Sequence, residues 1–260
     1  EKLPEFLRHQ CIQQGLIAPT PQFVSFCEEI IHTTSDLVLA YKPNSAFFER
    51  FVEDGWRSLE RVITYIHAYA PEVPVILDAK RGDIGNTNNG YIGMMDALRA
   101  DAITVHPFLG QESLAPFLEK SDKGIFVLCR TSNPGAGEFQ NQFVSIGPEE
   151  ADFFGSVGVP LEGSGLLTLA PFYTHIAYRV SREWNANKNC GLVVGATYPD
   201  ELRCVRKIVG DAMTILVPGV GAQGGDIQAA VEAGKNSHGR GLIVNSSSGI
   251  IFASKEEDFA

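Results

Sequence analysis

The stretch VPVILDAKRGDIGNT, residues 73–87, joins an apolar run to a cluster of charged and small polar residues. Its first part is rich in β-branched and apolar residues without strict alternation, which is typical of a strand buried on both faces of a parallel sheet. Asp78 and Lys80 are two residues apart, so a strand presents both side chains on one face. Buried charges are costly unless they are paired, so an apolar strand that ends in Asp78, Lys80 and Asp83 predicts a functional site.

Six further runs have the same apolar composition, and each ends at Gly, Pro, Asn or Ser. They are LVLAYKP (37–43), AITVHPF (102–108), GIFVLCRTSN (124–133), GLVVGATY (191–198), TILVPGVG (214–221) and GLIVNSS (241–247). Segments with helical spacing of apolar residues lie between them, for example 48–69 and 199–209. This alternation predicts βαβ units and an α/β fold built on a parallel sheet.

Seven strands leave two architectures open: an open doubly wound sheet, or a (β/α)8 TIM barrel whose first strand is missing from the chain as given. The barrel is favoured because polar residues follow six of the strands, where barrel active sites are built. Residues 1–15 already read as a helix, and EEDFA (256–260) reads as the start of another, so both ends look trimmed. We expect residues 1–260 to form a single barrel domain. An enlarged loop–helix segment around 134–190 would include an amphipathic helix over 168–184.

The charge balance and the cysteines limit the class of protein. The 260 residues carry 21 Lys and Arg against 31 Asp and Glu, a net charge of −10, which argues against non-specific binding to nucleic acid or anionic membranes. Five widely spaced cysteines without a CxxC pair indicate reduced thiols and a cytoplasmic protein. No signal peptide and no transmembrane run is visible.

Polar residues also follow the other strands. Lys42 ends the run 37–43, and TSNPG (131–135) offers short side chains suited to reading a base edge, although it also fits an ordinary turn. The loops PGVGAQGGD (218–226) and NSSSGI (245–250) follow the last two strands, where barrels commonly bind phosphate. His106 has no second histidine at ligand spacing, so a local hydrogen bond is expected rather than a metal.

Together these residues resemble the orotidine 5'-phosphate decarboxylase family, in particular its longer-chain bacterial branch. LDAKRGDIGNT (77–87) matches the family's catalytic motif, and TSNPGA, GLVVGATYP and LVPGVGAQGGD follow in the family's order. The resemblance covers nearly the whole chain. It implies conversion of orotidine 5'-monophosphate to UMP and CO2 in de novo pyrimidine biosynthesis, by a homodimer that needs no metal and no cofactor.

The resemblance also implies a role for each catalytic position. Lys80 would donate the proton to C6 of the base, and Asp78 would lie beside the substrate carboxylate. Asp83 would complete the charged network from the partner subunit, and Lys42 would link the ribose to that network. An ammonium held between carboxylates suits this chemistry, because decarboxylation leaves a carbanion that has no other electron sink.

Substrate contacts are implied at further positions. Ile84 would line the carboxylate pocket, and Thr87, also from the partner, would contact the ribose. Ser132 would read the pyrimidine edge, Pro218 would pack near the base, and Gln223 would bridge base and phosphate from a closing loop. Ser247 and Ser248 lie in the loop that would hold the phosphate.

One departure from the family concerns Ser248, because the family normally has an arginine there that grips the phosphate. Replacing a bidentate cation with a hydroxyl is expected to weaken phosphate binding and reduce turnover. Two alternatives stay open at this point. One is an Mg²⁺-dependent sugar-phosphate decarboxylase or hexulose-phosphate synthase of the same superfamily, and the other is an inactive relative that binds a phosphorylated ligand.

Overall fold

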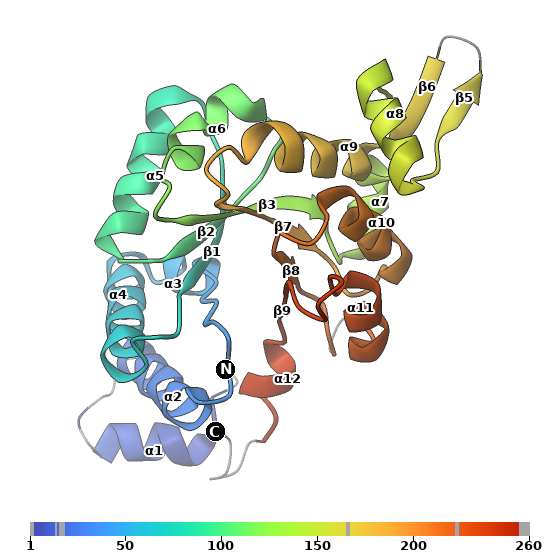
Figure 1. Cartoon of the computed structure of the whole chain (residues 1–260). Helices are drawn as coiled ribbons and strands as arrows, with labels where there is room; N and C mark the ends of the chain where they lie inside the picture. Colours follow the sequence, from blue (N-terminus) through green and yellow to red (C-terminus); the bar gives the residue numbers. More distant parts are fainter. Residues whose placement is uncertain (1–2, 14, 16–18, 165–166, 222–223, 255–260) are drawn as a thin grey trace. The chain divides into compact units, whose positions relative to one another are not determined.

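The computed structural model describes residues 3–13, 15, 19–164, 167–221 and 224–254. The chain divides into two compact units. Unit 1 comprises residues 1–81, 89–104 and 247–260, and unit 2 comprises residues 82–88 and 105–246. Both units combine strands with helices, in the order drawn in Figure 1. This is the predicted α/β class.

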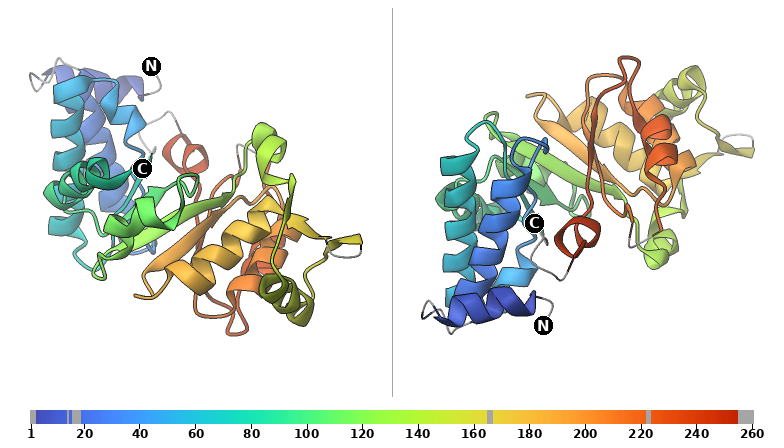
Figure 2. Two further views of the ribbon diagram at one scale, coloured as in Figure 1. Left: turned by 90° about the horizontal axis from the view of Figure 1, so that it is seen from above. Right: turned by 90° about the horizontal axis from the view of Figure 1, so that it is seen from below.

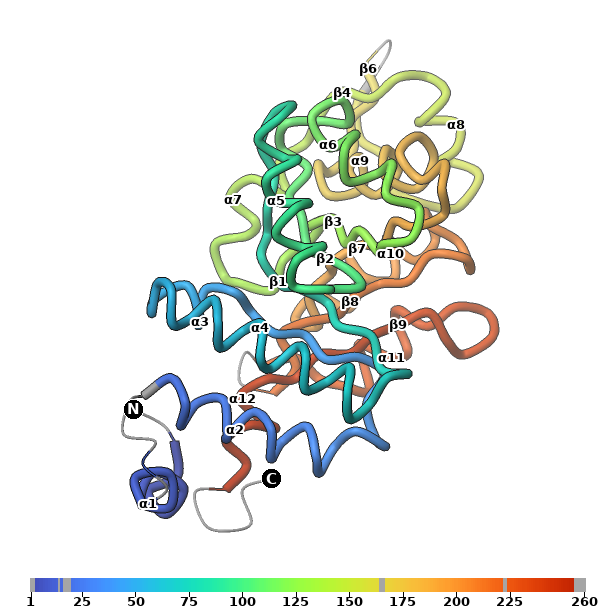
Figure 3. The backbone as a smooth tube through the Cα atoms, turned by 90° about the vertical axis from the view of Figure 1, so that its left-hand side faces the viewer, coloured from blue at the N-terminus to red at the C-terminus, as the bar shows by residue number. Residues whose placement is uncertain are grey.

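Unit 1 is built around a helical layer and strand β1. Its elements are α1 (Glu5–Gln13), α2 (Pro19–Thr34), α3 (Ala46–Glu49), α4 (Val52–Tyr69), β1 (Ile76–Arg81), most of α5 (Gly85–Ala97), nearly all of β2 (Ala102–Val105) and α12 (Ser248–Ile251). In α4, Leu59, Val62, Ile63 and Ile66 recur at helical spacing and are buried. Helix α2 packs between α1 and α4 (Figure 3).

Residues 37–43 do not form the predicted strand. Leu37 lies in a turn and Leu39 in a bend, and this part of the chain pairs through two isolated parallel bridges, Tyr41 with Val75 and Asn44 with Asp78. The Asp78 N–H donates to the Pro43 carbonyl, yet Pro43 has no N–H to continue the ladder. Leu37 and Leu39 are more than 70% exposed, so this run is not buried on both faces as its composition suggested.

Unit 2 contains a parallel sheet with the order β3 (Gly124–Arg130), β7 (Cys190–Val194), β8 (Ile215–Val217) and β9 (Leu242–Val244). Its register pairs Val127 with Leu192, and Leu192 with Ile215. Every residue of β7 and β8 is buried, which confirms the reading of these runs as strands covered on both faces. The helices that accompany this sheet are α6 (Gly110–Leu118), α9 (Phe172–Arg179), α10 (Pro199–Val209) and α11 (Ile227–Gly234).

The enlarged segment 134–190 holds more structure than the predicted loop and helix. It contains α7 (Gly137–Gln140), α8 (Pro148–Val157) and a small antiparallel sheet in the order β4 (Phe143–Ser145), β6 (Leu167–Pro171), β5 (Glu162–Ser164). Figure 2 shows the β5–β6 hairpin projecting from the rest of unit 2. The predicted helix over 168–184 was therefore wrong in its first part: Pro171 ends strand β6, and α9 begins directly after it.

The other predicted helices agree with the structure in part. The helix expected over 48–69 is divided into α3 and α4, because Val52 has a left-handed backbone with φ of 53°. The helix expected from EEDFA lies outside the described residues. By contrast, the expected helix over 199–209 and the expected N-terminal helix are both present, as α10 and α1.

Arg206 of α10 joins four parts of unit 2. Its Nε donates to the Gly234 carbonyl at 2.6 Å, Nη1 donates to the carbonyls of Gly210 and Met213, and Nη2 donates to the Gly241 carbonyl at 2.7 Å. The residue is 7% exposed, and its hydrogen bonds to the carbonyls of Gly234 and Met213 are buried. A single guanidinium thus satisfies the end of α11 and the chain that leads into β8 and β9.

Replacing Arg206 with methionine is expected to lower the free energy of unfolding by about 3 kcal/mol, because four backbone carbonyls lose a hydrogen bond and two of these bonds, to Gly234 and Met213, are buried. Urea denaturation followed by circular dichroism measures this. Arg203→Met is the matched control on the same helix: Arg203 is paired with exposed Asp200, so a change of less than about 0.5 kcal/mol is expected. Equal losses in the two variants would contradict the assignment.

Candidate active site

A buried carboxylate with two cations lies at the end of β1. Asp78 is 8% exposed, and its Oδ2 accepts a hydrogen bond from Lys42 Nζ at 2.7 Å. Its Oδ1 accepts from Lys80 Nζ at 2.6 Å and from the Thr104 hydroxyl at 2.9 Å. The structure therefore brings together three of the four predicted catalytic residues, Lys42, Asp78 and Lys80, within unit 1.

The electrostatics of this cluster favour the ionised carboxylate. Burial alone raises the pKa of Asp78, but the charges and hydrogen bonds of Lys42 and Lys80 act in the opposite direction and prevail, so the pKa lies below its ordinary value. Asp78 is thus an anion at neutral pH, and its two oxygens bind the side chains of two lysines. One negative charge is shared by two positive charges, which leaves the cluster with a surplus of positive charge.

The two lysines differ in exposure. The Lys42 side chain is 11% exposed, whereas that of Lys80 is 49% exposed. Lys80 also has a left-handed backbone with φ of 48°, and its N–H donates to the Thr104 hydroxyl at 2.9 Å. Lys80 is therefore the cation that a ligand can reach, and Thr104 supports both its backbone and its carboxylate partner.

Thr104 and Asn44 were not identified from the sequence. The Asn44 amide lies 3.5 Å from Asp78 Oδ2. The only signal for Thr104 was a polar residue within the apolar run AITV, a pattern that is also common in ordinary strands. Contacts of this kind depend on which chain segments lie beside β1, and no short motif records that.

Asp83, Ile84 and Thr87 lie in unit 2, where β1 leads into α5. Asp83 Oδ1 accepts a hydrogen bond from the Ile84 N–H at 2.7 Å, and the Ile84 side chain is 61% exposed. Thr87 is also exposed. The roles of these three residues stay predictions.

Asn88 fixes the backbone of this loop and was missed by the sequence reading. It is fully buried. Its Oδ1 accepts from the Asp83 N–H, and its Nδ2 donates to the carbonyls of Asp83 and Ser113. His106 lies nearby with Nε2 3.0 Å from the Gly82 carbonyl, as expected for a local hydrogen-bonding residue.

Ser132 and Pro218 follow β3 and β8, the strands on either side of β7, and both contact the connection after β7. The Thr197 hydroxyl donates to the Ser132 carbonyl at 3.1 Å, and the Ala196 N–H donates to the Pro218 carbonyl at 2.8 Å. Two of the predicted substrate contacts are thus joined through residues 196–197. Carboxyl ends of parallel strands are where α/β folds bind ligands.

The predicted phosphate loops are described in part. Gly219, Gly221 and Gly224 have positive φ, and the Gly224 N–H donates to the Gly221 carbonyl. The carboxylate of Asp226 caps α11 by accepting from the Ala229 N–H, so this helix end already carries a negative charge. Gln223 lies outside the described residues. Ser247 and Ser248 are exposed at the start of α12.

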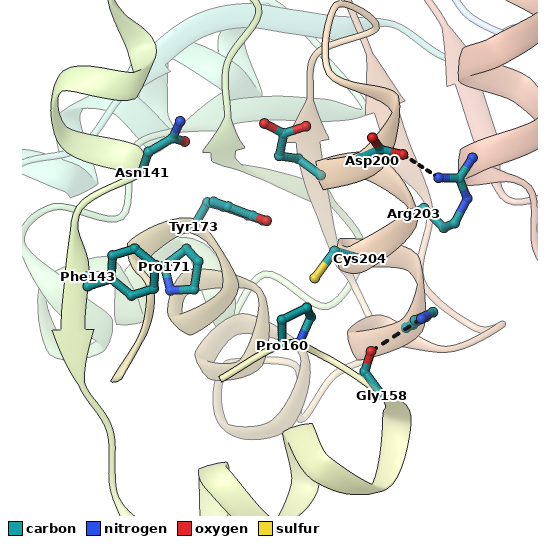
Figure 4. Close-up of a pocket in the computed structure, with 11 residues that line it drawn as sticks. Asn141, Phe143, Gly158, Pro160, Pro171, Tyr173, Asp200, Arg203 and Cys204 are labelled. Atoms are coloured by element: carbon teal, nitrogen blue, oxygen red, sulfur yellow. Dashed lines mark hydrogen bonds and ion pairs between the residues drawn. The ribbon is translucent and has the colours of Figure 1, made fainter. Parts of the chain in front are cut away.

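A cavity of about 560 Å³ lies elsewhere in unit 2, between α10 and the small antiparallel sheet (Figure 4). Phe143, Pro160 and Pro171 form its apolar wall, and the Tyr173 hydroxyl and the Cys204 thiol point into it. Burial raises the pKa of Tyr173 and that of Cys204, so both groups stay protonated. No predicted site residue lines this cavity, and a protonated thiol is a poor nucleophile.

The described part of the chain holds no group of three or more His, Cys, Asp or Glu side chains arranged to bind a metal ion. None of its helices is both long and apolar enough to cross a bilayer.

The sequence of this chain is similar to those of a known enzyme family. The model of the orotidine 5'-phosphate decarboxylase / HUMPS family matches residues 22–160. The orotidine 5'-phosphate decarboxylase of Azoarcus sp. (strain BH72) is 47% identical over 237 residues, which cover 90% of this chain and 78% of that protein. This chain belongs to the orotidine 5'-phosphate decarboxylase / HUMPS family. The Cupriavidus metallidurans relative of the same name is 46% identical over 91% of the chain.

Solved structures of orotidine 5'-phosphate decarboxylases support the fold. The chain is similar to Leishmania donovani OMP decarboxylase, with a TM-score of 0.74 and 36% identity over 90% of this chain and 81% of that one. It is also similar to Leishmania donovani UMP synthase, with a TM-score of 0.76 and 38% identity over 89% of this chain, but it spans only 46% of that longer chain. The predicted (β/α)8-barrel fold is confirmed.

The lowered pKa of Asp78 predicts how stability depends on pH. Because the folded pKa lies below the unfolded value, the carboxylate stabilises the fold above about pH 4, and this contribution is lost as the pH falls through the folded pKa. We expect the difference in the free energy of unfolding between the wild type and Asp78→Asn to become smaller below pH 4. Urea denaturation at pH 7, 5, 4 and 3 measures it, and a difference that is the same at all four values would refute the ionised pair.

Proposed function

We propose that this chain is a carboxy-lyase that converts orotidine 5'-monophosphate to UMP and CO2, the last step of de novo pyrimidine biosynthesis. The observation that carries the proposal is the exposed Lys80 ammonium, which is held on the buried Asp78 carboxylate. The relatives at 46–47% identity, named orotidine 5'-phosphate decarboxylase, support the choice of substrate.

The chemistry follows from the charge of the cluster. When the bond between C6 of the base and the carboxyl carbon breaks, CO2 leaves and the electron pair stays on C6. An ammonium already held beside that carbon stabilises the pair electrostatically, without reorganising at the moment of reaction. Lys80 then transfers its proton to C6, and the product is UMP.

Lys42 and Asp78 act on Lys80 and on the substrate. We propose that Asp78 lies beside the substrate carboxylate and that Lys42 links the ribose to the charged network. Since Asp78 is tied to Lys42, Lys80 and Thr104 at once, it has little freedom to turn when a substrate enters. A fixed carboxylate of this kind keeps the Lys80 ammonium in one place, which is what preorganised catalysis requires.

The remaining predicted contacts are part of the proposal. Ile84 lines the carboxylate pocket, Ser132 and Pro218 contact the base, Gln223 bridges base and phosphate, and Ser247 and Ser248 meet the phosphate. Asp83 and Thr87 act across the interface of a homodimer. No metal and no cofactor take part.

The organisation of the protein is also part of the proposal. We place both units in one catalytic domain, because each is assembled from separate chain segments. The five cysteines are all free, which supports a cytoplasmic location.

Turnover tests the proposal directly. The ultraviolet absorbance of orotidine 5'-monophosphate is expected to change during incubation with the protein in EDTA, and Lys80→Ala is expected to lose at least about 1,000-fold in rate. Lys235→Ala, which removes a surface lysine paired with Glu232, is the matched control and should keep the wild-type rate. Loss of activity in EDTA would point to a metal-dependent sugar-phosphate enzyme, and binding without turnover would point to an inactive relative.

Ser248→Arg tests the phosphate loop separately. Restoring a guanidinium beside the phosphate is expected to lower KM for orotidine 5'-monophosphate by about tenfold or more, since charge-assisted bidentate pairs are stronger than a hydroxyl contact. Steady-state kinetics measures it. Ser248→Lys is the comparison for charge without the bidentate geometry and should lower KM less. An unchanged KM in both variants would remove Ser248 from the phosphate site.

Mixing two inactive variants tests the shared site. If Asp83 acts across the interface, random exchange between Lys80→Ala and Asp83→Ala subunits makes half of the dimers mixed. Each mixed dimer then has one complete site, so about a quarter of wild-type activity should return. Mass spectrometry of the intact dimers confirms the mixing. No recovery in demonstrably mixed dimers would place Asp83 and Lys80 of one subunit in the same site.

A further inference from the structure

The residue before Ser132 is held by side chains from two directions. Gln140 Oε1 accepts from the Thr131 N–H at 2.8 Å, and Gln140 Nε2 donates to the Thr131 hydroxyl at 3.0 Å. That hydroxyl donates to Asn133 Oδ1 at 2.7 Å. On the other side, Arg130 Nη1 donates to the Thr131 carbonyl at 2.9 Å. The backbone that leads into Ser132 therefore has its donor and its acceptor bound by side chains.

Ser132 itself is fixed through its backbone, while its hydroxyl is left over. The Thr197 hydroxyl donates to the Ser132 carbonyl, and Gly195 lies so close that a Cβ there would be 2.6 Å from Ser132 Cα. Within the described part of the chain, the Ser132 hydroxyl has no hydrogen-bond partner. A half-buried hydroxyl on a fixed backbone is available to a ligand without reorganisation.

Arg130 is buried at a considerable cost. It is 1% exposed, its guanidinium carbon lies 3.7 Å from the centre of the Tyr198 ring, and its Nη2 is 4.0 Å from Glu201. Its Nε has no hydrogen-bond partner among the described residues. Burying a guanidinium with incomplete hydrogen bonding costs more free energy than burying an apolar side chain of similar size. Filling space therefore does not explain why an arginine lies here.

We propose that Gln140 and Arg130 are positioning residues that hold Thr131, and through it aim the Ser132 hydroxyl at the edge of the nucleobase. This inference rests on the proposed function, because it takes Ser132 as a base contact. Gln140 belongs to α7, which lies in the enlarged segment 134–190. The proposal therefore gives this segment a role in substrate recognition. Neither side chain touches the substrate; both act through the Thr131 backbone.

Gln140→Ala tests the proposal. It is expected to raise KM for orotidine 5'-monophosphate about tenfold and to change kcat less than about threefold, because Lys80 and Asp78 are untouched. The affinity for UMP, measured by isothermal titration calorimetry, should fall by the same factor. Gln142→Ala, two residues further along the chain, is the matched control. Its side chain donates to the Glu138 carbonyl in an exposed hydrogen bond and does not contact Thr131, so both constants should stay at wild-type values.

A double-mutant cycle separates positioning from a merely structural role. If Gln140 acts through Ser132, then Gln140→Ala should have no further effect on KM or on UMP affinity in a Ser132→Ala background. Effects that multiply in the double variant, or an unchanged KM in Gln140→Ala, would overturn the proposal. Arg130→Lys provides a second variant that keeps the buried charge; loss of the Nη1 hydrogen bond to the Thr131 carbonyl should again raise KM and leave kcat near the wild-type value.

Turnover and UMP binding distinguish a failure of the proposed function from a failure of the positioning role. A wild-type protein that binds UMP but does not turn over orotidine 5'-monophosphate would contradict the proposed activity, while the UMP affinities of the variants would still decide the positioning role. A wild-type protein that does not bind UMP would overturn both.

Discussion

The buried carboxylate of Asp78 is the group on which the account of this protein depends. Removing a carboxylate from water costs several kcal/mol, so it persists at the end of an apolar strand only because Lys42, Lys80 and Thr104 bind it. The same hydrogen bonds hold the side chains of Lys42 and Lys80 in place. One interaction thus makes the strand end stable and supplies the positive charge that decarboxylation needs.

Several other side chains stabilise the conformation of loops through hydrogen bonds to the backbone. Arg206 connects the ends of several elements in unit 2, Asn88 ties the loop that carries Asp83, and Gln140 and Arg130 hold Thr131. In each case a side chain binds backbone groups in a loop or at the end of a strand or helix. Loops at strand ends carry the proposed substrate contacts, and backbone hydrogen bonds from side chains are the means by which irregular segments become rigid.

Much of the fold could be predicted from the sequence, because buried parallel strands and amphipathic helices have local signatures. Six of the seven expected runs contain strands, and α10 has the expected bounds. The strand predicted over 37–43 is absent, because the apolar composition of the run does not show that Pro43 interrupts the backbone hydrogen bonding. Strand β6 was predicted as helix because five residues are too few for the spacing of apolar residues to distinguish strand from helix.

The site divides in the same way. Asp78, Lys80 and Lys42 were predicted from charge at strand ends and from the resemblance, and the structure brings them together. Thr104, Asn44 and Asn88 were missed, since each is an ordinary polar residue whose importance comes only from the segment it faces. A short sequence motif identifies the charged residues at the end of a strand. The residues that contact them come from other parts of the chain and are determined by the tertiary structure.

A crystal structure of the protein with UMP bound is the most direct measurement of the central claim. If Lys80 donates the proton that C6 receives, its Nζ should lie within about 3–3.5 Å of C6, still bound to Asp78 and facing the base from the end of β1. A base bound with C6 beyond the reach of Lys80, or a Lys80 ammonium that has left Asp78 for another partner, would contradict the account.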